Sequence, residues 1–171
     1  MFVKVSIIMS CYNSQATIGQ SVESILNQSY ENFELLICDD GSIDSTFREI
    51  EKYSKADKRI SIFKNEKNIG LTKSLNLLIN KSDGEFIARQ DDDDISLSHR
   101  IETQIKVIKD LNLDFATSRA KILGTDKLIP GLSFNLPVSF VMNFKNPFIH
   151  GTLLIKKKIL NDIGNYDERF Y

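Results

Sequence analysis

The chain has 171 residues, of which 42% are hydrophobic and 26% charged, and its net charge is −1 at pH 7. These are ordinary globular values that exclude intrinsic disorder and low-complexity classes, and the lack of a basic surplus argues against nucleic acid as a partner. No apolar run approaches the roughly 18 residues of a membrane span and the N-terminus has no secretory pattern, so we expect a cytoplasmic domain over residues 1–171.

Short apolar runs alternate with helical patterns over the first two thirds of the chain. The apolar runs predict four strands, at residues 3–9, 33–38, 60–63 and 85–89. Apolar residues spaced three and four apart predict helices at 14–28, 71–79 and 98–109. The same spacing predicts a further helix that begins after a cap at Asp44 or Ser45. This order predicts an α/β fold, in which a mostly parallel central sheet carries helices on both faces.

The pattern loosens after about Leu111. We expect short strands at 114–117, 121–123 and 152–155, with all three prolines in the irregular stretch between them. No linker or internal repeat separates this part from the first, which predicts one domain with an irregular second half. Cys11 and Cys38 lie at predicted strand ends without a CxxC partner, so we expect buried thiols and not a redox pair.

Polar residues follow each predicted strand, at 10–13, 39–42, 68–70 and 91–94. Open α/β sheets bind their ligands at the carboxyl ends of their strands, so these segments are expected to converge on one site. Tyr12 is either a base-stacking ring or a half-buried core aromatic. An aspartate in 39–42 accepts a hydrogen bond from a nucleobase or ribose, or caps a helix, and Asn68 and Gly70 predict a turn before a helix whose amides face the ligand.

The acidic run 91–94 follows its strand directly. Runs of like charge are usually solvated loops. If the strand continues, however, Asp91 and Asp93 share one side, where two carboxylates favour Mg²⁺ or Mn²⁺ with a ligand's phosphates. An EF-hand calcium loop is rejected, because Ile95 and Ser96 stand where that loop needs an oxygen ligand and a glycine.

Signatures of several other enzyme classes are absent from the sequence. It has no GxG spacing, no GxxxxGK[ST], no GxSxG and no HExxH, which excludes the dinucleotide fingerprint and the P-loop. Its two histidines exclude a His-rich zinc site. We expect His99 on the surface and a structural role for His150.

Ordered segments of the chain resemble the family 2 glycosyltransferases of the GT-A fold. These segments are 5–13, 39–46, 68–70 with 74–76, 88–94, 150–155 and 163–170. The resemblance spans nearly the whole chain and implies a Rossmann-like GT-A domain. It also implies inverting transfer of a sugar from a nucleotide donor, usually UDP-linked, to a hydroxyl, in the assembly of a bacterial surface polysaccharide or glycan.

The resemblance implies roles for individual residues. The nucleotide-sugar site would comprise Ser10, Tyr12, Asn13, Asp40, Asn68, Asp91 and Asp92. Tyr12 would stack on the base, Ser10 and Asn13 would line its pocket, and Asp40 would hold it. Residues 91–93 match the family's DxD motif.

Within that motif, Asp91 and Asp93 would ligate Mn²⁺ or Mg²⁺ and Asp92 would reach the ribose. The charge of Asp92 departs from the small residue usual there. This departure is expected to alter the affinity for the metal.

The family's general base is an acidic residue shortly after the Tyr-Asp-Glu-x-Phe segment, and this sequence stops at Tyr171, before it. We therefore expect a domain truncated at its C-terminal, acceptor-side end, which binds donor but transfers poorly, since base catalysis contributes about 10²–10⁴ in rate. A glycan or lipid-linked glycan acceptor, and peripheral contact with the inner face of the membrane, would involve the part after Tyr171.

Two other functions stay open. The first is a nucleotide-sugar-binding module without transferase activity. Sugar turnover by a longer chain, as opposed to binding alone, would distinguish the enzyme from this module. A sugar-phosphate nucleotidyltransferase needs a glycine-rich basic loop after the first strand, and residues 10–15 contain neither a glycine nor a cation.

Overall fold

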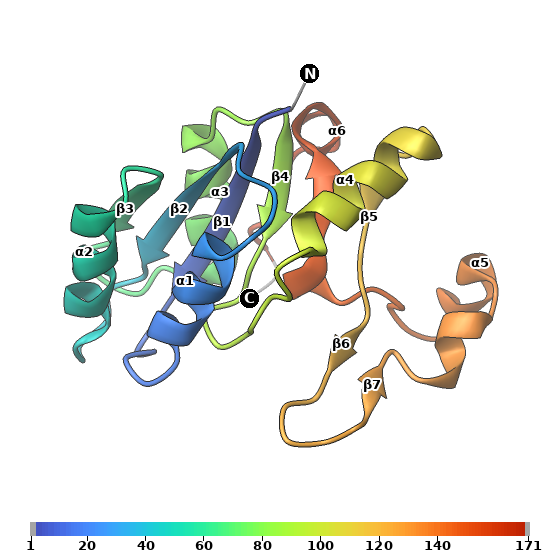
Figure 1. The fold of residues 1–171 in the computed structure, drawn as a ribbon, viewed down its shortest axis with the longest axis horizontal. Helices are drawn as coiled ribbons and strands as arrows, with labels where there is room; N and C mark the ends of the chain where they lie inside the picture. The colour runs from blue at the N-terminus through green and yellow to red at the C-terminus, as the bar shows by residue number, and fades with distance from the viewer. Residues whose placement is uncertain (1–2, 170–171) are drawn as a thin grey trace.

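Strands and helices alternate regularly up to Asp110 in the computed structural model, which describes residues 3–169 (Figure 1). The elements are β1 (Val5–Cys11), α1 (Ile18–Leu26), β2 (Phe33–Asp39), α2 (Thr46–Ala56), β3 (Ile60–Lys64), α3 (Leu71–Lys81), β4 (Phe86–Arg89) and α4 (Arg100–Asp110). The four strands and four helices predicted here are confirmed. Helix α1 starts four residues later than predicted, because residues 14–17 form a turn in which the Ser14 carbonyl accepts hydrogen bonds from the amides of Thr17 and Ile18.

The central sheet has the strand order β3-β2-β1-β4-β8-β5, where β5 is Phe115–Ala116 and β8 is Leu154–Lys156. β1 pairs in parallel with β2 and β4, and β2 in parallel with β3. β8 runs antiparallel to both β4 and β5. The expected mostly parallel sheet is therefore confirmed, with an antiparallel pair at one edge.

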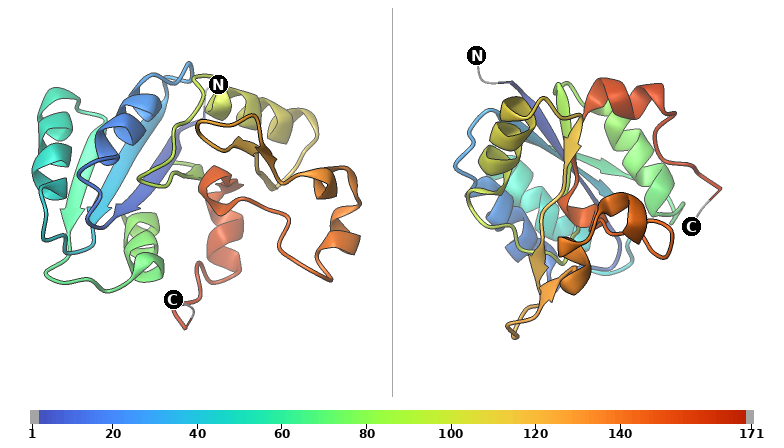
Figure 2. Two further views of the ribbon diagram at one scale, coloured as in Figure 1. Left: turned by 90° about the horizontal axis from the view of Figure 1, so that it is seen from below. Right: turned by 90° about the vertical axis from the view of Figure 1, so that its right-hand side faces the viewer.

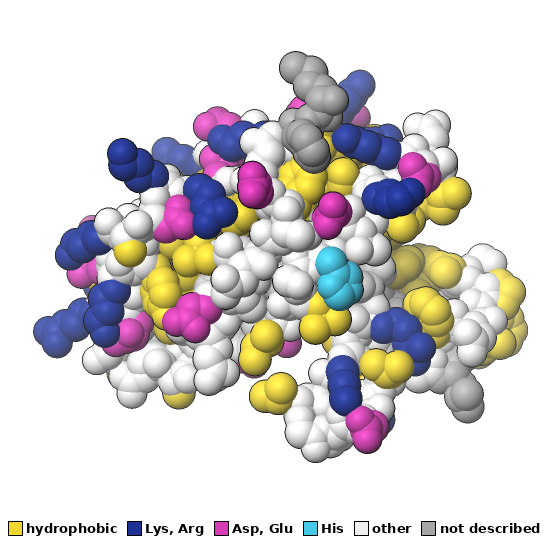
Figure 3. Space-filling model, viewed as in Figure 1, with side chains coloured by type: hydrophobic (Ala, Val, Ile, Leu, Met, Phe, Trp, Pro, Cys, Tyr) yellow, Lys and Arg dark blue, Asp and Glu magenta, His cyan; other side chains and the backbone are white. Residues whose placement is uncertain are grey.

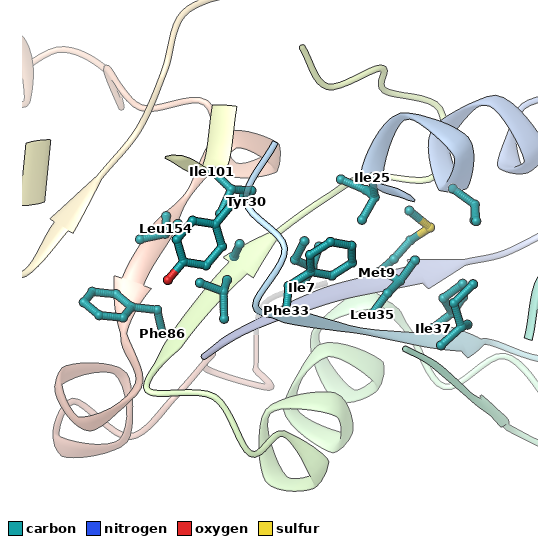
Figure 4. Packing of buried hydrophobic residues seen from close by; sticks show 14 of the residues in the cluster. Ile7, Met9, Ile25, Tyr30, Phe33, Leu35, Ile37, Phe86, Ile101 and Leu154 are labelled. Carbon is teal, nitrogen blue, oxygen red and sulfur yellow. The ribbon is translucent and has the colours of Figure 1, made fainter. Parts of the chain in front are cut away.

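Helices cover both faces of this sheet, as predicted (Figure 2). On one face α1, α2 and α4 pack on side chains such as Ile7 and Met9 of β1 (Figure 4). On the other face α3 and α6 (Lys157–Asp162) pack on Ile8. Because β1 is buried on both faces, it is apolar at nearly every position instead of alternating. Cys11 and Cys38 are buried and unbridged, as expected, and burial raises the pKa of the Cys38 thiol to about 11.

The segment 117–149, here called the arm, projects from the sheet between β5 and β8 (Figure 1). It contains the hairpin of β6 (Ala120–Lys121) and β7 (Leu128–Ile129), a 3₁₀ turn at Leu132–Asn135 and the short helix α5 (Val138–Val141). Figure 3 shows hydrophobic side chains exposed on it, at the right of the view. Of these elements only the first strand was expected, at 121–123, because the arm has no sustained apolar period.

The predicted strand 152–155 begins later than expected, at Leu154. The residues before it, His150–Thr152, form a 3₁₀ turn, η2. Across residues 3–169, no helix is long and apolar enough to cross a bilayer.

Candidate functional site

The loops after β1 and β2 are joined by hydrogen bonds at the carboxyl edge of the sheet. The amide of Asn13 donates to Ser42 Oγ at 2.9 Å, and Asn13 Oδ1 accepts the amide of Ile43 at 3.0 Å. Asn13 adopts a φ of 52°, in the left-handed region that asparagine tolerates better than most residues. Ser10 is buried beneath these loops, whereas Tyr12 is 45% exposed and belongs to neither core cluster, which favours the stacking interpretation of its ring.

Asp40 joins the loop after β2 to the loop after β3. Its buried carboxylate accepts Asn65 Nδ2 at 2.8 Å, the amide of Ile69 at 3.0 Å and that of Gly70 at 2.9 Å. Asn68 lies exposed in the same loop and accepts the Gly70 amide at 3.1 Å. Asp40 thus lies at the predicted edge, where it holds the backbone of residues 69–70.

The neighbouring Asp39 is fully buried and carries a free acceptor. Its Oδ1 accepts the amide of Ser42 at 3.1 Å, while its Oδ2 has no partner among residues 3–169. A buried carboxylate oxygen without a donor is costly, and it marks a place where a ligand can donate. Sequence reasoning selected Asp40 instead, since nothing in the Asp-Asp pair says which carboxylate is already occupied.

The acidic run forms a turn and not a continued strand. β4 ends at Arg89, and the amide of Asp94 donates to the carbonyl of Asp91 at 3.3 Å. A Cβ placed on Gly151 of η2 would lie 2.7 Å from Asp91 Oδ2 and 2.9 Å from Asp94 Oδ2. The turn replaces the alternation of an extended chain, so the strand-based reason for grouping Asp91 with Asp93 does not apply, and Asp91 and Asp94 both face Gly151.

Asp92 points to the loop after β1 instead. It accepts the Ser14 hydroxyl and, at 3.4 Å, the amide of Tyr12. Asp93 is exposed at the tip of the turn. The turn therefore presents Asp92 on the side of Tyr12 and Asp91 with Asp94 on the side of η2, with Asp93 between them.

Two buried guanidinium groups lie beneath the acidic run, and the sequence analysis assigned neither. The Arg89 side chain is 9% exposed, and its Nε donates to Asp91 Oδ1 at 3.0 Å. Arg100 donates through Nη1 to the carbonyls of Arg89 and Gly151, at 3.0 and 3.1 Å. A charged residue at the end of an otherwise apolar strand was the available signal for Arg89, and the polar Arg100 on the buried face of α4 was the signal for the other.

The carboxylates of the run repel one another. Desolvation raises the pKa of Asp92, although the hydrogen bonds from Ser14 and Tyr12 oppose the rise. Desolvation also raises the pKa of Asp94, and the charges of Asp91 and Asp93 raise it further. The run thus holds more negative charge than its surroundings neutralise.

The charge count fits a divalent cation. The four aspartates at 91–94 outnumber the two arginines beneath them, Arg89 and Arg100, by two negative charges. Within residues 3–169, no group of three or more His, Cys, Asp or Glu side chains is arranged to hold a metal alone. Mg²⁺ and similar ions are commonly bound by one or two carboxylates together with substrate phosphates, and the run can supply that smaller number.

Residues near the C-terminus also reach this site. Asn76 on α3 donates to the Tyr166 carbonyl at 2.9 Å and accepts the Tyr166 amide at 3.1 Å. Burial raises the pKa of the Tyr166 hydroxyl, which lies beside Arg89. Phe170, the last residue of the resembling segment, lies outside the described residues.

The two histidines differ in their contacts. His99 is exposed at the start of α4, as expected. His150 contacts Asn146 Nδ2 through Nε2 at 2.7 Å. Its backbone belongs to η2, beside the acidic run.

Comparison with known sequences gives a family match. The family described as "Glycosyl transferase family 2" matches residues 6–164. The chain is 34% identical over 172 residues to the "Putative glycosyltransferase EpsE" of Bacillus subtilis (strain 168), covering 95% of this chain and 60% of that protein. It is 37% identical over 125 residues to the Escherichia coli "UDP-Glc:alpha-D-GlcNAc-diphosphoundecaprenol beta-1,3-glucosyltransferase WfgD", covering 73% and 49%.

Solved structures match the fold. Staphylococcus aureus TarS 1-349 in complex with UDP superposes with a TM-score of 0.81 at 23% identity, covering 97% of this chain and 51% of that one. The mannosyltransferase PcManGT from Pyrobaculum calidifontis, in complex with GDP-Man and Mn²⁺, superposes with a TM-score of 0.79 at 20% identity, covering 96% and 47%. The chain therefore has the GT-A architecture and spans about half to 60% of the length of these four proteins.

Proposed function

Since this chain belongs to glycosyl transferase family 2, we propose that it binds a nucleotide-diphospho-sugar and that the whole protein transfers the sugar, with inversion, to a hydroxyl acceptor. The observation that carries the proposal is that hydrogen bonds join the four strand-end loops along one edge of the sheet, and that the last of them, the acidic turn, retains two uncompensated negative charges. A parallel sheet places its ligand at this edge.

The nucleoside would lie over the loops after β1 and β2. Tyr12 is half-exposed there and offers a ring for stacking, while Asp39 Oδ2 offers an acceptor for a ring N–H of the base. Ser10 and Asn13 would line the pocket. Asp40, for which sequence reasoning favoured contact with the base, would serve the same site by holding the loop that carries Asn68.

The diphosphate would lie over the acidic turn. Asp91 and Asp93 would hold Mn²⁺ or Mg²⁺, and Asp92, which accepts the Tyr12 amide, would reach the ribose. The bound cation would stabilise the negative charge that develops on the leaving diphosphate. Asp91 is fixed for this role by its ion pair with Arg89.

The donor and acceptor are proposed by analogy with relatives. WfgD is named for UDP-Glc and a diphosphoundecaprenol-linked acceptor, and TarS has been solved with UDP. We propose a UDP-sugar donor and a glycan or lipid-linked glycan acceptor at the cytoplasmic face of the membrane. Polysaccharide assembly is the corresponding process.

Thermal unfolding with UDP, GDP, CDP and dTDP, each with and without Mn²⁺, tests the donor site. A nucleotide at 100 times its Kd stabilises by about 2.7 kcal/mol, which is several degrees for a domain of this size. We expect the largest shift with UDP and Mn²⁺, and its loss in Asp93→Ala.

Asp126→Ala is the matched control, since Asp126 is an exposed aspartate on the arm, paired only with Lys121 among the described residues. It should keep the full shift. If no nucleotide stabilises the folded wild-type protein, the proposed function is wrong for this chain.

A further inference from the structure

We propose that Arg100 is a built-in counter-ion of the acidic run, which weakens binding of a divalent cation alone so that the cation enters together with the donor diphosphate. The proposal rests on the proposed function and adds an order of binding to it. It assigns to Arg100 a positioning role, acting through the aspartates and not on the substrate.

The position of Arg100 supports this role. The residue is 8% exposed and donates from one nitrogen to the Gly151 carbonyl at 3.1 Å. The same Gly151 faces Asp91 Oδ2 and Asp94 Oδ2, so closely that a Cβ would stand 2.7 and 2.9 Å from them. The guanidinium and the two carboxylates are therefore separated by little more than the backbone of one glycine.

The positive charge exceeds what the fold requires at this place. One helical turn further along α4, Gln104 makes the same kind of tie, donating to the Thr152 carbonyl at 2.7 Å and to that of Ala116 at 3.4 Å. A neutral amide thus holds η2 to α4 adequately. Arg100 makes two carbonyl contacts of the same type, so its charge must be explained by something other than these hydrogen bonds.

Arg100 neutralises the run without occupying its oxygens. Its Nε and Nη2 are buried and have no hydrogen-bond partner in residues 3–169, and no carboxylate there lies within the 4.0 Å of an ion pair with it. A buried guanidinium is strongly disfavoured unless nearby negative charge compensates it, and Asp94 and Asp91 exert that field. Because Arg100 makes no salt bridge with the run, its charge acts on the run without covering the carboxylate oxygens that would hold a cation. Arg89, by contrast, binds Asp91 directly.

The consequence concerns the order of binding. A cation that approaches the free protein meets an acidic run already half compensated by Arg89 and Arg100, and the positive charge of Arg100 repels it. A nucleoside diphosphate brings new negative charge to the same place and restores the attraction. The cation and the donor should therefore bind cooperatively, and the cation alone weakly.

Three variants separate charge from structure. In Arg100→Gln the hydrogen bonds can persist without the charge, and we expect Mn²⁺ alone to bind about tenfold more tightly than to wild type, since the repulsion is gone. Arg100→Lys keeps the charge and should match wild type. Gln104→Leu removes the neighbouring neutral tie and should lower stability while leaving the Mn²⁺ affinity unchanged.

Each variant is titrated with Mn²⁺ alone, and binding is measured by calorimetry and by the shift in thermal unfolding. The quantity compared between variants is the affinity for Mn²⁺. Unchanged or weaker Mn²⁺ binding by folded Arg100→Gln would overturn the proposal, as would equal effects of Gln and Lys. If Arg100→Gln folds only when Mn²⁺ is added, and not in NaCl of equal ionic strength, the proposal is supported; if Mn²⁺ does not restore folding, it is overturned. Failure of wild type to bind any nucleotide with Mn²⁺ would refute the proposed function instead, and the comparison with Mn²⁺ alone would still decide the role of Arg100.

Discussion

The half of the molecule from β1 to α4 and the arm at 117–149 meet at the same edge of the sheet but are built differently. In the first half, strands such as β1 are buried along their whole length between two layers of helices. In the arm, by contrast, hydrophobic side chains face outward: nine of the nineteen exposed large hydrophobic residues among those described lie between Ile122 and Phe144.

The difference extends to the polar contacts. In the first half, side chains such as Asp40 and Asn13 bind backbone amides of other loops, about thirty residues away in sequence. In the arm, most hydrogen bonds are local, as those of Asn143 with Ser139 and of Thr125 with Ile122. Long-range hydrogen bonds fix the geometry of the strand-end loops, whereas the arm is shaped mainly by its own short turns.

Truncation of side chains to alanine in the two regions should give the largest contrast in the free energy of unfolding. Ile37 of β2 is fully buried, and Ile37→Ala should lower the free energy of unfolding by about 3–4 kcal/mol through lost burial and a cavity. Phe144 on the arm is 76% exposed, and Phe144→Ala should change it by less than about 0.5 kcal/mol. Urea unfolding of both variants measures this, and comparable losses would show that the arm is a cooperative part of the core.

A second contrast concerns buried and exposed aspartates. Asp40→Ala leaves three donors at Asn65, Ile69 and Gly70 without their acceptor, which should cost about 2–3 kcal/mol. Asp126→Ala on the arm should cost almost nothing, because Asp126 is fully exposed and its partner Lys121 is 57% exposed. Chemical denaturation of the two variants decides the matter, and a loss below about 1 kcal/mol for Asp40→Ala would mean that the loop does not depend on this carboxylate.

The smallest expected effect is a pH dependence confined to the sheet half. Burial disfavours the charged form of Glu34, but hydrogen bonds from Lys4, Ser6 and the amide of Asp83 outweigh it and lower its pKa. A lowered carboxyl pKa stabilises the fold above the unfolded pKa of about 4.3, and this contribution is lost as pH falls through the folded value. Urea midpoints between pH 7 and pH 3 should therefore fall less steeply in Glu34→Gln than in wild type; parallel curves would rule the contribution out.

The predictability of the fold from sequence follows the same division. Strand-like and helix-like apolar patterns predict β1 to α4 correctly, because in that half most apolar residues of the elements pack into the two core layers on either face of the sheet. The arm has no such periodicity. The hairpin partner β7 and helix α5 were accordingly missed, and Thr152, the last residue of η2, was assigned to the following strand.

In the site, sequence reasoning located the edge but not the pairing of side chains. The segments after β1 to β4 converge as expected, since topology alone brings them there. That Asp91 lies beside Asp94, or that Gly151 faces both, depends on a turn and on a residue far along the chain, for which no local pattern exists. Nor does the Asp-Asp pair at the end of β2 reveal that Asp40 is occupied and Asp39 partly free.

The antiparallel return of β8 makes the arm exchangeable. Ala116 at the end of β5 lies opposite Leu154 at the start of β8, so the two ends of the arm are clamped together by the sheet itself. The entropy of closing a loop between fixed ends rises only with the logarithm of its length. Arms of other lengths and sequences can therefore be accommodated at this junction without displacing Gly151 or the acidic turn.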